Sequence, residues 1–256
     1  MKHFLVVLVL AAVVFSACKK TSSPSPSNTP LASFQPTTVG SQWNYKVTES
    51  LDPSSSLLLS AAEVSLGYTI PAIDTQWTTT ITATGTDTTI NGLPYAVLTA
   101  DASAADNVYS AKQDSNYYGI GIIPEFSLTG IGSLATQAPI LYLKDTTAGA
   151  TWQQVVIAPA GVGVSDTTTY TITITAVDGQ MTVNGTTYSN VTTETVKALP
   201  SGISSLAGPA GIPSGIDLSI IGTYYFARGI GLIEVNIDAS LYGFQYLQTL
   251  TLSTIK

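Results

Sequence analysis

The sequence predicts an all-β fold, either an antiparallel β-sandwich or an open, incomplete β-barrel, with long apolar loops and at most one or two short helices. Three observations indicate it. Apolar and polar side chains alternate with a period of two along many short segments, as on strands with one buried face. Asn-Gly pairs, typical of tight hairpins, separate neighbouring segments. Roughly twelve to fourteen such segments occur without a strand–helix–strand rhythm, which favours an antiparallel arrangement.

The chain begins with a segment typical of a secretion signal. Lys2 and His3 form a short basic start, an apolar run follows over residues 4–15, and small residues close it. This run is well short of the roughly 20 apolar residues that a spanning helix needs. We therefore expect residues 1–17 to be a signal peptide.

The signal ends in Phe15-Ser16-Ala17-Cys18, which resembles the lipobox of bacterial lipoproteins, although leucine is commonest where Phe15 stands. The resemblance implies that Cys18 becomes the acylated first residue of the mature protein. Each buried CH₂ group of an acyl chain contributes about 0.8 kcal/mol to membrane binding. We therefore expect a lipid-anchored protein of the bacterial cell envelope, held in the outer membrane. An ordinary cleaved signal is the alternative.

A tether is predicted between the anchor and the folded part. Residues 19–33 are rich in Ser, Pro and Thr and show no apolar periodicity, as in an extended linker. With Cys18 they form the segment 18–33, and residues 34–256 are expected to form a single β domain.

The first half of this domain contains most of the short strands. Trp43, Tyr45 and Val47 alternate with polar residues and predict the first strand. Residues 52–67 place apolar side chains on one helical face, which favours a short helix. Turns are expected at Asn91-Gly92 and at 114–116. Further strands are predicted, in order, at 75–85, 88–90, 95–98, 108–111, 117–120, 140–144 and 152–157.

The second half has the clearest alternation, over residues 167–198. Asp178-Gly179 and Asn184-Gly185 predict two turns in it, and hence a meander of three strands. Closing strands are predicted at 222–228, 232–238 and 246–255.

Two motifs near the ends of the domain give a second resemblance. Gly40-Ser41-Gln42-Trp43-Asn44-Tyr45 and Tyr225-Phe226-Ala227-Arg228-Gly229-Ile230-Gly231 match G-x-x-W-x-Y and Y-x-A-[KR]-G-[VI]-G. Both are similar to motifs of largely uncharacterised Gram-negative envelope lipoproteins. The resemblance implies a domain that needs both ends of the chain to close, and no activity. From the residues themselves, Gly229 and Gly231 would relieve a tight bend, and Arg228, the only arginine, is expected to pair with a carboxylate.

Several reaction classes are excluded by the residues that the mature chain lacks. His3 is the only histidine and Cys18 the only cysteine, so the domain has no disulfide, thiol nucleophile, catalytic histidine or usual zinc site. We expect a non-enzymatic protein without a cofactor. Loss of Lys2 leaves 8 basic against 16 acidic residues, a net charge of about −8, which disfavours nucleic acid as a partner.

Three apolar stretches interrupt the β pattern, at residues 119–139, 158–164 and 199–222. They could form a mouth for a lipid or another hydrophobic ligand, or they could close the open end of the β structure. The first interpretation assigns these side chains to the mouth: Ile120, Ile122, Ile123, Phe126, Leu128, Ile131, Val162, Ile203, Leu206, Ile212 and Ile216.

Other functions rest on less specific signals. Trp43, Trp77, Trp152, Tyr117 and Tyr118 could stack on sugar rings in a carbohydrate-binding or glycan-processing lipoprotein, but aromatic residues at period two are more often core. A structural or adhesive module is a further alternative.

Two weak motifs are rejected. Residues 130–135 fit the dinucleotide pattern G-x-G-x-x-A without any strand–helix context. Residues 101–107 and 114–116 are oxygen-rich but lack calcium-loop spacing, and are expected to be turns.

Overall fold

The computed structural model describes residues 32–35, 37–51, 73–101, 103–121, 127–128, 132–133, 138–157, 167–200, 219–241 and 244–256. The chain divides into two compact units, Met1–Leu31 and Ala32–Lys256, and all described residues belong to the second. The predicted signal peptide, the lipobox with Cys18, most of the tether and the predicted short helix therefore lie outside them. Among the described residues, no helix is long and apolar enough to cross a membrane.

The described part of the second unit consists of strands joined by turns and bends. In chain order the strands are β1 (Gln42–Leu51), β2 (Ile73–Ile90), β3 (Leu93–Ala100), β4 (Ser103–Gln113), β5 (Asn116–Ile120), β6 (Ser127–Leu128), β7 (Gly132–Ser133), β8 (Ile140–Lys144), β9 (Thr151–Ile157), β10 (Thr167–Val183), β11 (Thr186–Pro200), β12 (Ser219–Ala227), β13 (Gly231–Leu241) and β14 (Phe244–Ile255).

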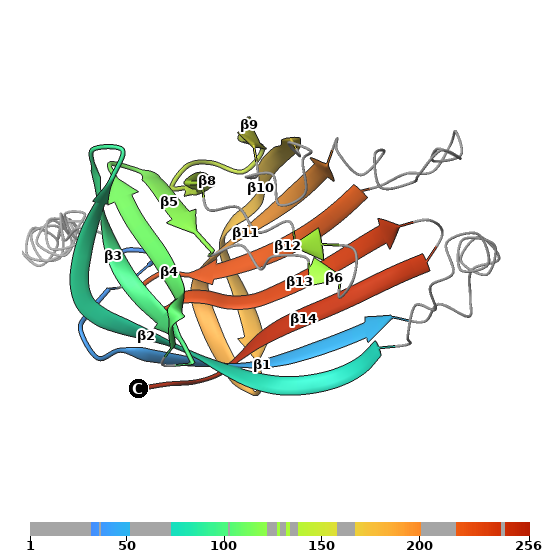
Figure 1. The fold of residues 1–256 in the computed structure, drawn as a ribbon. Coiled ribbons are helices and arrows are strands. Elements are labelled where there is room, and N and C mark those ends of the chain that lie inside the picture. The colour runs from blue at the N-terminus through green and yellow to red at the C-terminus, as the bar shows by residue number, and fades with distance from the viewer. Residues whose placement is uncertain are drawn as a thin grey trace, which may run out of the picture. The chain divides into compact units, whose positions relative to one another are not determined.

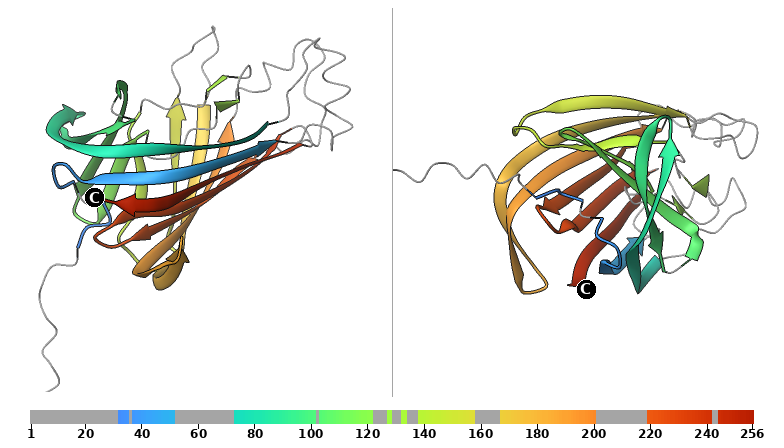
Figure 2. Two further views of the ribbon diagram at one scale, coloured as in Figure 1. Left: turned by 90° about the horizontal axis from the view of Figure 1, so that it is seen from below. Right: turned by 90° about the vertical axis from the view of Figure 1, so that its left-hand side faces the viewer.

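Twelve of these strands form one antiparallel sheet that curls into an open barrel (Figure 1, Figure 2). Its order is β8-β5-β4-β3-β2-β1-β14-β13-β12-β11-β10-β9, and β6 and β7 form a separate pair. The predicted all-β antiparallel class is confirmed, and of the two predicted architectures the structure has the open barrel.

The two Asn-Gly turns are confirmed. Asn91 and Gly92 have φ values of 52° and 81°, and Asn184 and Gly185 have 49° and 79°. Positive φ at both central residues is the geometry whose twist matches that of the flanking strands. Each pair therefore closes a tight hairpin, β2–β3 and β10–β11.

The turn predicted at Asp178-Gly179 is wrong. β10 continues through this point, and its pairing with β11 shifts register between Ala176 and Gly179 and again at Gln180. Asp178 has a φ of 54°, so it takes the left-handed conformation inside the strand. An extra residue in this conformation forms a β-bulge, which bends the strand without reversing it.

The two ends of the domain meet, as the motif resemblance implies. β1 pairs with β14 along its length. The indole Nε1 of Trp43 donates to the carbonyl oxygen of Ile230 at 2.8 Å, and the hydroxyl of Tyr45 donates to that of Leu232 at 2.9 Å. These contacts join the early motif to the late one, so both motifs have a structural role here. The bend predicted at Gly229 and Gly231 is also confirmed, with φ values of 76° and 105°.

The sheet edges, β8 and β9, come together at a seam that side chains close. The Gln154 side chain accepts from the Leu141 amide at 2.9 Å and donates to the Pro139 carbonyl at 2.7 Å. The Trp152 indole donates to the Leu141 carbonyl at 2.9 Å. No β8–β9 ladder occurs in the described strands. The Gln154 amide therefore takes the place of a backbone peptide.

Gln154→Ala is expected to destabilise the domain by about 1–3 kcal/mol, because it leaves a backbone N–H and a carbonyl without partners. Urea unfolding measures the loss, and hydrogen exchange at the Leu141 amide locates it. Gln153→Ala is the matched control, since the neighbouring Gln153 is exposed and hydrogen-bonds only Thr171 in the described contacts. Equal midpoints for the two variants would show that the seam contributes nothing.

Candidate functional site

The apolar mouth predicted from the sequence lies almost entirely outside the described residues. Ile120 is buried at the end of β5, and Leu128 is placed by its backbone in β6. The mouth thus stays a prediction at the remaining positions: Ile122, Ile123, Phe126, Ile131, Val162, Ile203, Leu206, Ile212 and Ile216.

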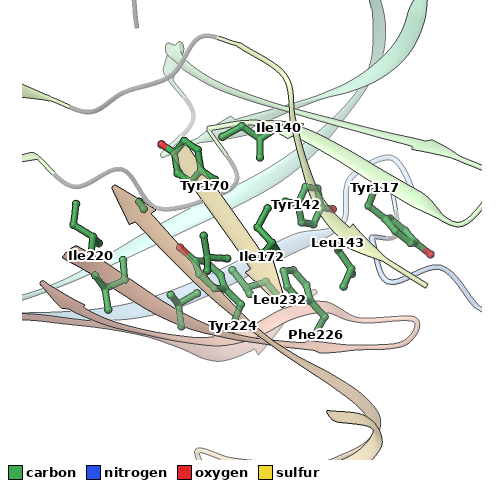
Figure 3. Packing of buried hydrophobic residues seen from close by; sticks show 14 of the residues in the cluster. Tyr117, Ile140, Tyr142, Leu143, Tyr170, Ile172, Ile220, Tyr224, Phe226 and Leu232 are labelled. Carbon is green, nitrogen blue, oxygen red and sulfur yellow. The ribbon is translucent and has the colours of Figure 1, made fainter. Parts of the chain in front are cut away.

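The structure instead draws attention to the inner face of the curled sheet, where aromatic side chains form a continuous series (Figure 3). Ring centroids are separated by 5.9 Å between Phe34 and Tyr117, 6.4 Å between Tyr117 and Tyr142, 5.6 Å between Tyr142 and Phe226, and 6.5 Å between Phe226 and Tyr224. These spacings are typical of interacting rings. Tyr142 belongs to the edge strand β8 and Phe226 to β12, so the series packs one edge of the sheet across the interior.

Gly222 makes room for the last ring of this series. A Cβ atom at Gly222 would lie 2.5 Å from a ring carbon of Tyr224. The ring therefore folds back over the glycine and covers its backbone, as aromatic residues do beside glycines in strands. This fixes Tyr224 on the inner face of β12.

Glu194 is the one acidic side chain buried completely in the described part of this interior. It lies on β11, in register with Ile174 on β10 and Tyr224 on β12, both buried. Its exposed fraction is 0%, and neither carboxyl oxygen has a hydrogen-bond partner. Burial raises the pKa of Glu194 well above its usual range, which favours the uncharged acid. Burial raises the pKa of the Tyr224 hydroxyl, and Glu194 raises it further where its carboxyl is ionised.

A second inner-face glutamate, Glu49, differs from Glu194 because its carboxylate has hydrogen-bond partners. Glu49 on β1 accepts a hydrogen bond from the Tyr246 hydroxyl and another from the Thr75 hydroxyl at 3.4 Å. Burial, and then the bond to Glu49, raise the pKa of Tyr246. The fold thus supplies partners to one inner carboxyl and none to Glu194.

Among the described residues, Trp77 is the exposed aromatic side chain of the inner face. It lies opposite Val47 in the β1–β2 ladder, and directly opposed residues of an antiparallel pair point to the same side. Val47 is buried, and Trp43 and Tyr45 lie on the same, inward-facing side of β1. Trp77 nevertheless has an exposed fraction of 41%. The inner face is therefore open to solvent beside β2.

The other aromatic candidates are core or seam residues. Trp43 and Tyr117 are buried, and Tyr118 is half-buried. Trp152 is half-buried, bonded across the seam and covered by the Lys144 ammonium at 4.8 Å. Of the predicted sugar-stacking set, Trp77 alone is exposed.

The turn predicted over residues 101–107 is wrong beyond Asp101, because residues 103–107 belong to β4. Asp101 has a φ of 49°, and its carboxylate accepts from the Thr80 amide at 2.7 Å and the Thr79 hydroxyl at 3.0 Å. Asp114 occupies the β4–β5 turn with a φ of 55°. Among the described residues, no three His, Cys, Asp or Glu side chains gather to hold a metal ion.

Burial of Glu194, exposure of Trp77 and the seam role of Gln154 were not predicted from the sequence. The signal for Glu194 was available, because it has the same period-two phase as Val196 and Ala198. Exposure of Trp77 and pairing across the seam depend on how the sheet curls, which no local pattern records.

The chain has little similarity to known proteins. No protein-family model matches it, and no curated protein matches it. Two solved structures resemble it, one named as an exported protein with a YmcC-like fold from Bacteroides fragilis and one named as a lipoprotein from Parabacteroides distasonis. Their identities are 11% and 8%, with TM-scores of 0.41 for both. Each alignment covers 88% of this chain and 99% of the other chain. At these values the similarities assign neither a family nor a function to the chain.

Proposed function

We propose that this is a non-enzymatic, lipid-anchored protein of the bacterial cell envelope, held in the outer membrane, whose β domain binds an apolar ligand. Support for the anchor comes from the apolar signal that ends in Phe15-Ser16-Ala17-Cys18. The lack of histidine and of a second cysteine after the signal supports a binding role over catalysis.

The exposure of Trp77 on the inner face is the observation that carries the ligand proposal. Eight strands make a barrel whose interior side chains just fill, and wider sheets leave more room. This sheet has twelve strands. Trp77 faces inward and stays exposed to solvent. An apolar ligand that covers its ring would bury this apolar surface, which favours binding.

Trp77→Ala is expected to weaken binding of the apolar fluorophore N-phenyl-1-naphthylamine by roughly tenfold, since a buried aromatic contact is worth about 1–3 kcal/mol. Fluorescence titration of the mature domain measures this. Leu247→Ala is the control, because Leu247 is exposed to a similar extent, 43%, and lies opposite the exposed Asp238 on the outer face. A wild-type domain that binds no apolar probe would refute the proposal.

Cys18→Ser is expected to release the protein from the membrane. Without the thiol no thioether-linked acyl chains can be attached, so the chain loses the anchor that burial of CH₂ groups provides. Detergent-phase partitioning and incorporation of labelled palmitate measure the change. Continued membrane association and labelling in the variant would exclude Cys18 as the acylated residue.

A carbohydrate ligand is the second candidate, favoured by the same exposed ring. Trp77 shares the inner face of β2 with Thr75 and Thr79. Their hydroxyls donate to Glu49 and Asp101, and their oxygens can still accept from sugar hydroxyls beside a stacked ring. A glycan array with the wild type and Trp77→Ala separates this candidate from an apolar ligand. Absence of both ligands would leave a structural or adhesive module.

A further inference from the structure

Trp77 and Glu194 lie at the two ends of one cross-strand row. Starting from Trp77 on β2, the paired residues on successive strands are Val47, Leu250, Val235, Tyr224 and Glu194. Five strand intervals of about 4.8 Å separate the end members along the curved sheet. Between the exposed indole and the buried carboxyl the row is apolar except for the Tyr224 hydroxyl, and Val47, Val235 and Tyr224 are buried in the ligand-free domain.

The buried end of this row has an unmet hydrogen-bonding requirement. Glu194 has no partner for either oxygen, and a buried polar group without a partner is costly. In the described part of the chain the one ion pair joins Arg228 to Asp145, so no cation compensates Glu194. Among the described residues, the titratable groups that interact with Glu194 are the hydroxyls of Tyr224 on β12 and Tyr142 on β8.

We propose that Glu194 binds the polar head of the apolar ligand, whose chain extends along this row toward Trp77, and that the head is an uncharged group that both donates and accepts a hydrogen bond, such as a hydroxyl or an amide. A neutral carboxyl offers one donor and one acceptor, which such a head satisfies together. An anionic head would bring a charge to a buried site where no described cation pairs with Glu194. A cationic head would have to shed its hydration shell in the same dry site.

Glu194 is fully buried, so a ligand reaches it only if part of the surrounding structure moves. Tyr142 belongs to β8, the edge strand that the Gln154 and Trp152 side chains attach to β9. An edge held by side chains opens at a lower cost than a strand paired on both sides. Opening this edge would carry Tyr142, which interacts electrostatically with Glu194, away from the carboxyl.

The inference rests on the proposed function, and displacement of N-phenyl-1-naphthylamine tests the two separately. Dodecan-1-ol, dodecanoate and dodecylammonium are compared on the wild type, Glu194→Gln and Glu194→Leu. Of the three ligands, dodecan-1-ol should bind most tightly to the wild type. Glu194→Gln should retain this affinity within about threefold, because its amide also donates and accepts. Glu194→Leu should lose roughly tenfold, the effect of one buried hydrogen bond.

Each outcome bears on one claim. A wild type that binds the fluorophore but gives equal dodecan-1-ol affinity in all three proteins would overturn the role of Glu194. Preference for dodecanoate or dodecylammonium would overturn the uncharged head. Failure of the wild type to bind the fluorophore would overturn the proposed function itself. Glu194→Gln also guards against misfolding, since it preserves the size and shape of the side chain.

Discussion

Glu194→Gln is expected to flatten the pH dependence of stability of the ligand-free domain. Burial raises the folded-state pKa of Glu194 well above its usual value of 4.5. Well below pH 4.5, the folded and unfolded chains both carry the proton, and the carboxyl contributes no pH dependence. As pH rises above 4.5, the unfolded chain releases the proton while the folded chain keeps it.

The sign follows from proton binding. Stability falls with pH wherever the folded state binds more protons than the unfolded state, by up to about 1.4 kcal/mol per pH unit for one group. The free energy of unfolding of the wild type should therefore decrease from pH 4.5 toward the folded pKa of Glu194. Glutamine does not titrate, so the free energy of unfolding of Glu194→Gln should rise relative to that of the wild type over the same pH interval.

Urea unfolding between pH 4 and pH 8.5 measures this difference, below the range where the tyrosines Tyr142 and Tyr224 titrate in the unfolded chain. Glu234→Gln is the control, because it removes an equal charge from a half-buried side chain that already accepts a hydrogen bond from Asn236. Parallel profiles for the wild type and Glu194→Gln would show that Glu194 ionises as readily in the folded chain as in the unfolded one.

Local patterns predicted the strands of this fold because each strand is specified by its own alternation and by the turn beside it. The Asn91-Gly92 and Asn184-Gly185 hairpins follow from two residues that tolerate positive φ. The same residue types gave a wrong turn prediction at Asp178-Gly179, because an aspartate in the left-handed conformation also fits a bulge within a continuous strand. A dipeptide therefore identifies a special backbone conformation without saying whether the chain reverses there.

The candidate site was harder to predict, because it depends on long-range pairing. Trp77 and Glu194 are brought into one row by five successive strand pairings, and the chain between them contributes other strands. The seam depends on β8 and β9 meeting as edges after the sheet has curled. The sequence predicted that Arg228 pairs with a carboxylate but not with which one, since Asp145 is 83 residues away in sequence.

Arg228 joins three segments of the domain that are distant in sequence. Its guanidinium binds both carboxylate oxygens of Asp145, at 2.8 Å and 2.5 Å, just after β8. The same group lies 4.2 Å from the centre of the Phe34 ring, which is buried where the predicted tether ends. The next amide, of Gly229, donates to the Ser33 carbonyl at 2.8 Å. The turn between β12 and β13 therefore fastens both the start of the domain and the end of an edge strand.

Arg228→Ala is expected to destabilise the domain by about 2–4 kcal/mol. The loss combines a bidentate charge-assisted bond, a cation–π contact and a carboxylate left without its partner. The side chains are only 11% and 29% exposed, so solvent replaces little of this. Arg228→Lys keeps the charge but not the planar guanidinium, so its stability should lie between those of the wild type and Arg228→Ala. A double-mutant cycle with Asp145→Ala isolates the pair by urea unfolding, and additive effects would show that the two side chains are not coupled.

The pH dependence of this penalty has the opposite sign to that of Glu194. The hydrogen bond from Arg228 lowers the pKa of Asp145 below its usual 3.8, and its charge adds to this. A depressed carboxyl pKa stabilises the fold above the unfolded value, and this stability is lost as pH falls through the folded value. The penalty of Arg228→Ala should therefore be complete at pH 6 and shrink below pH 3.8. Limited proteolysis near Phe34 should be faster in Arg228→Ala than in the wild type at pH 6. Equal rates would show that Arg228 does not hold this segment in place.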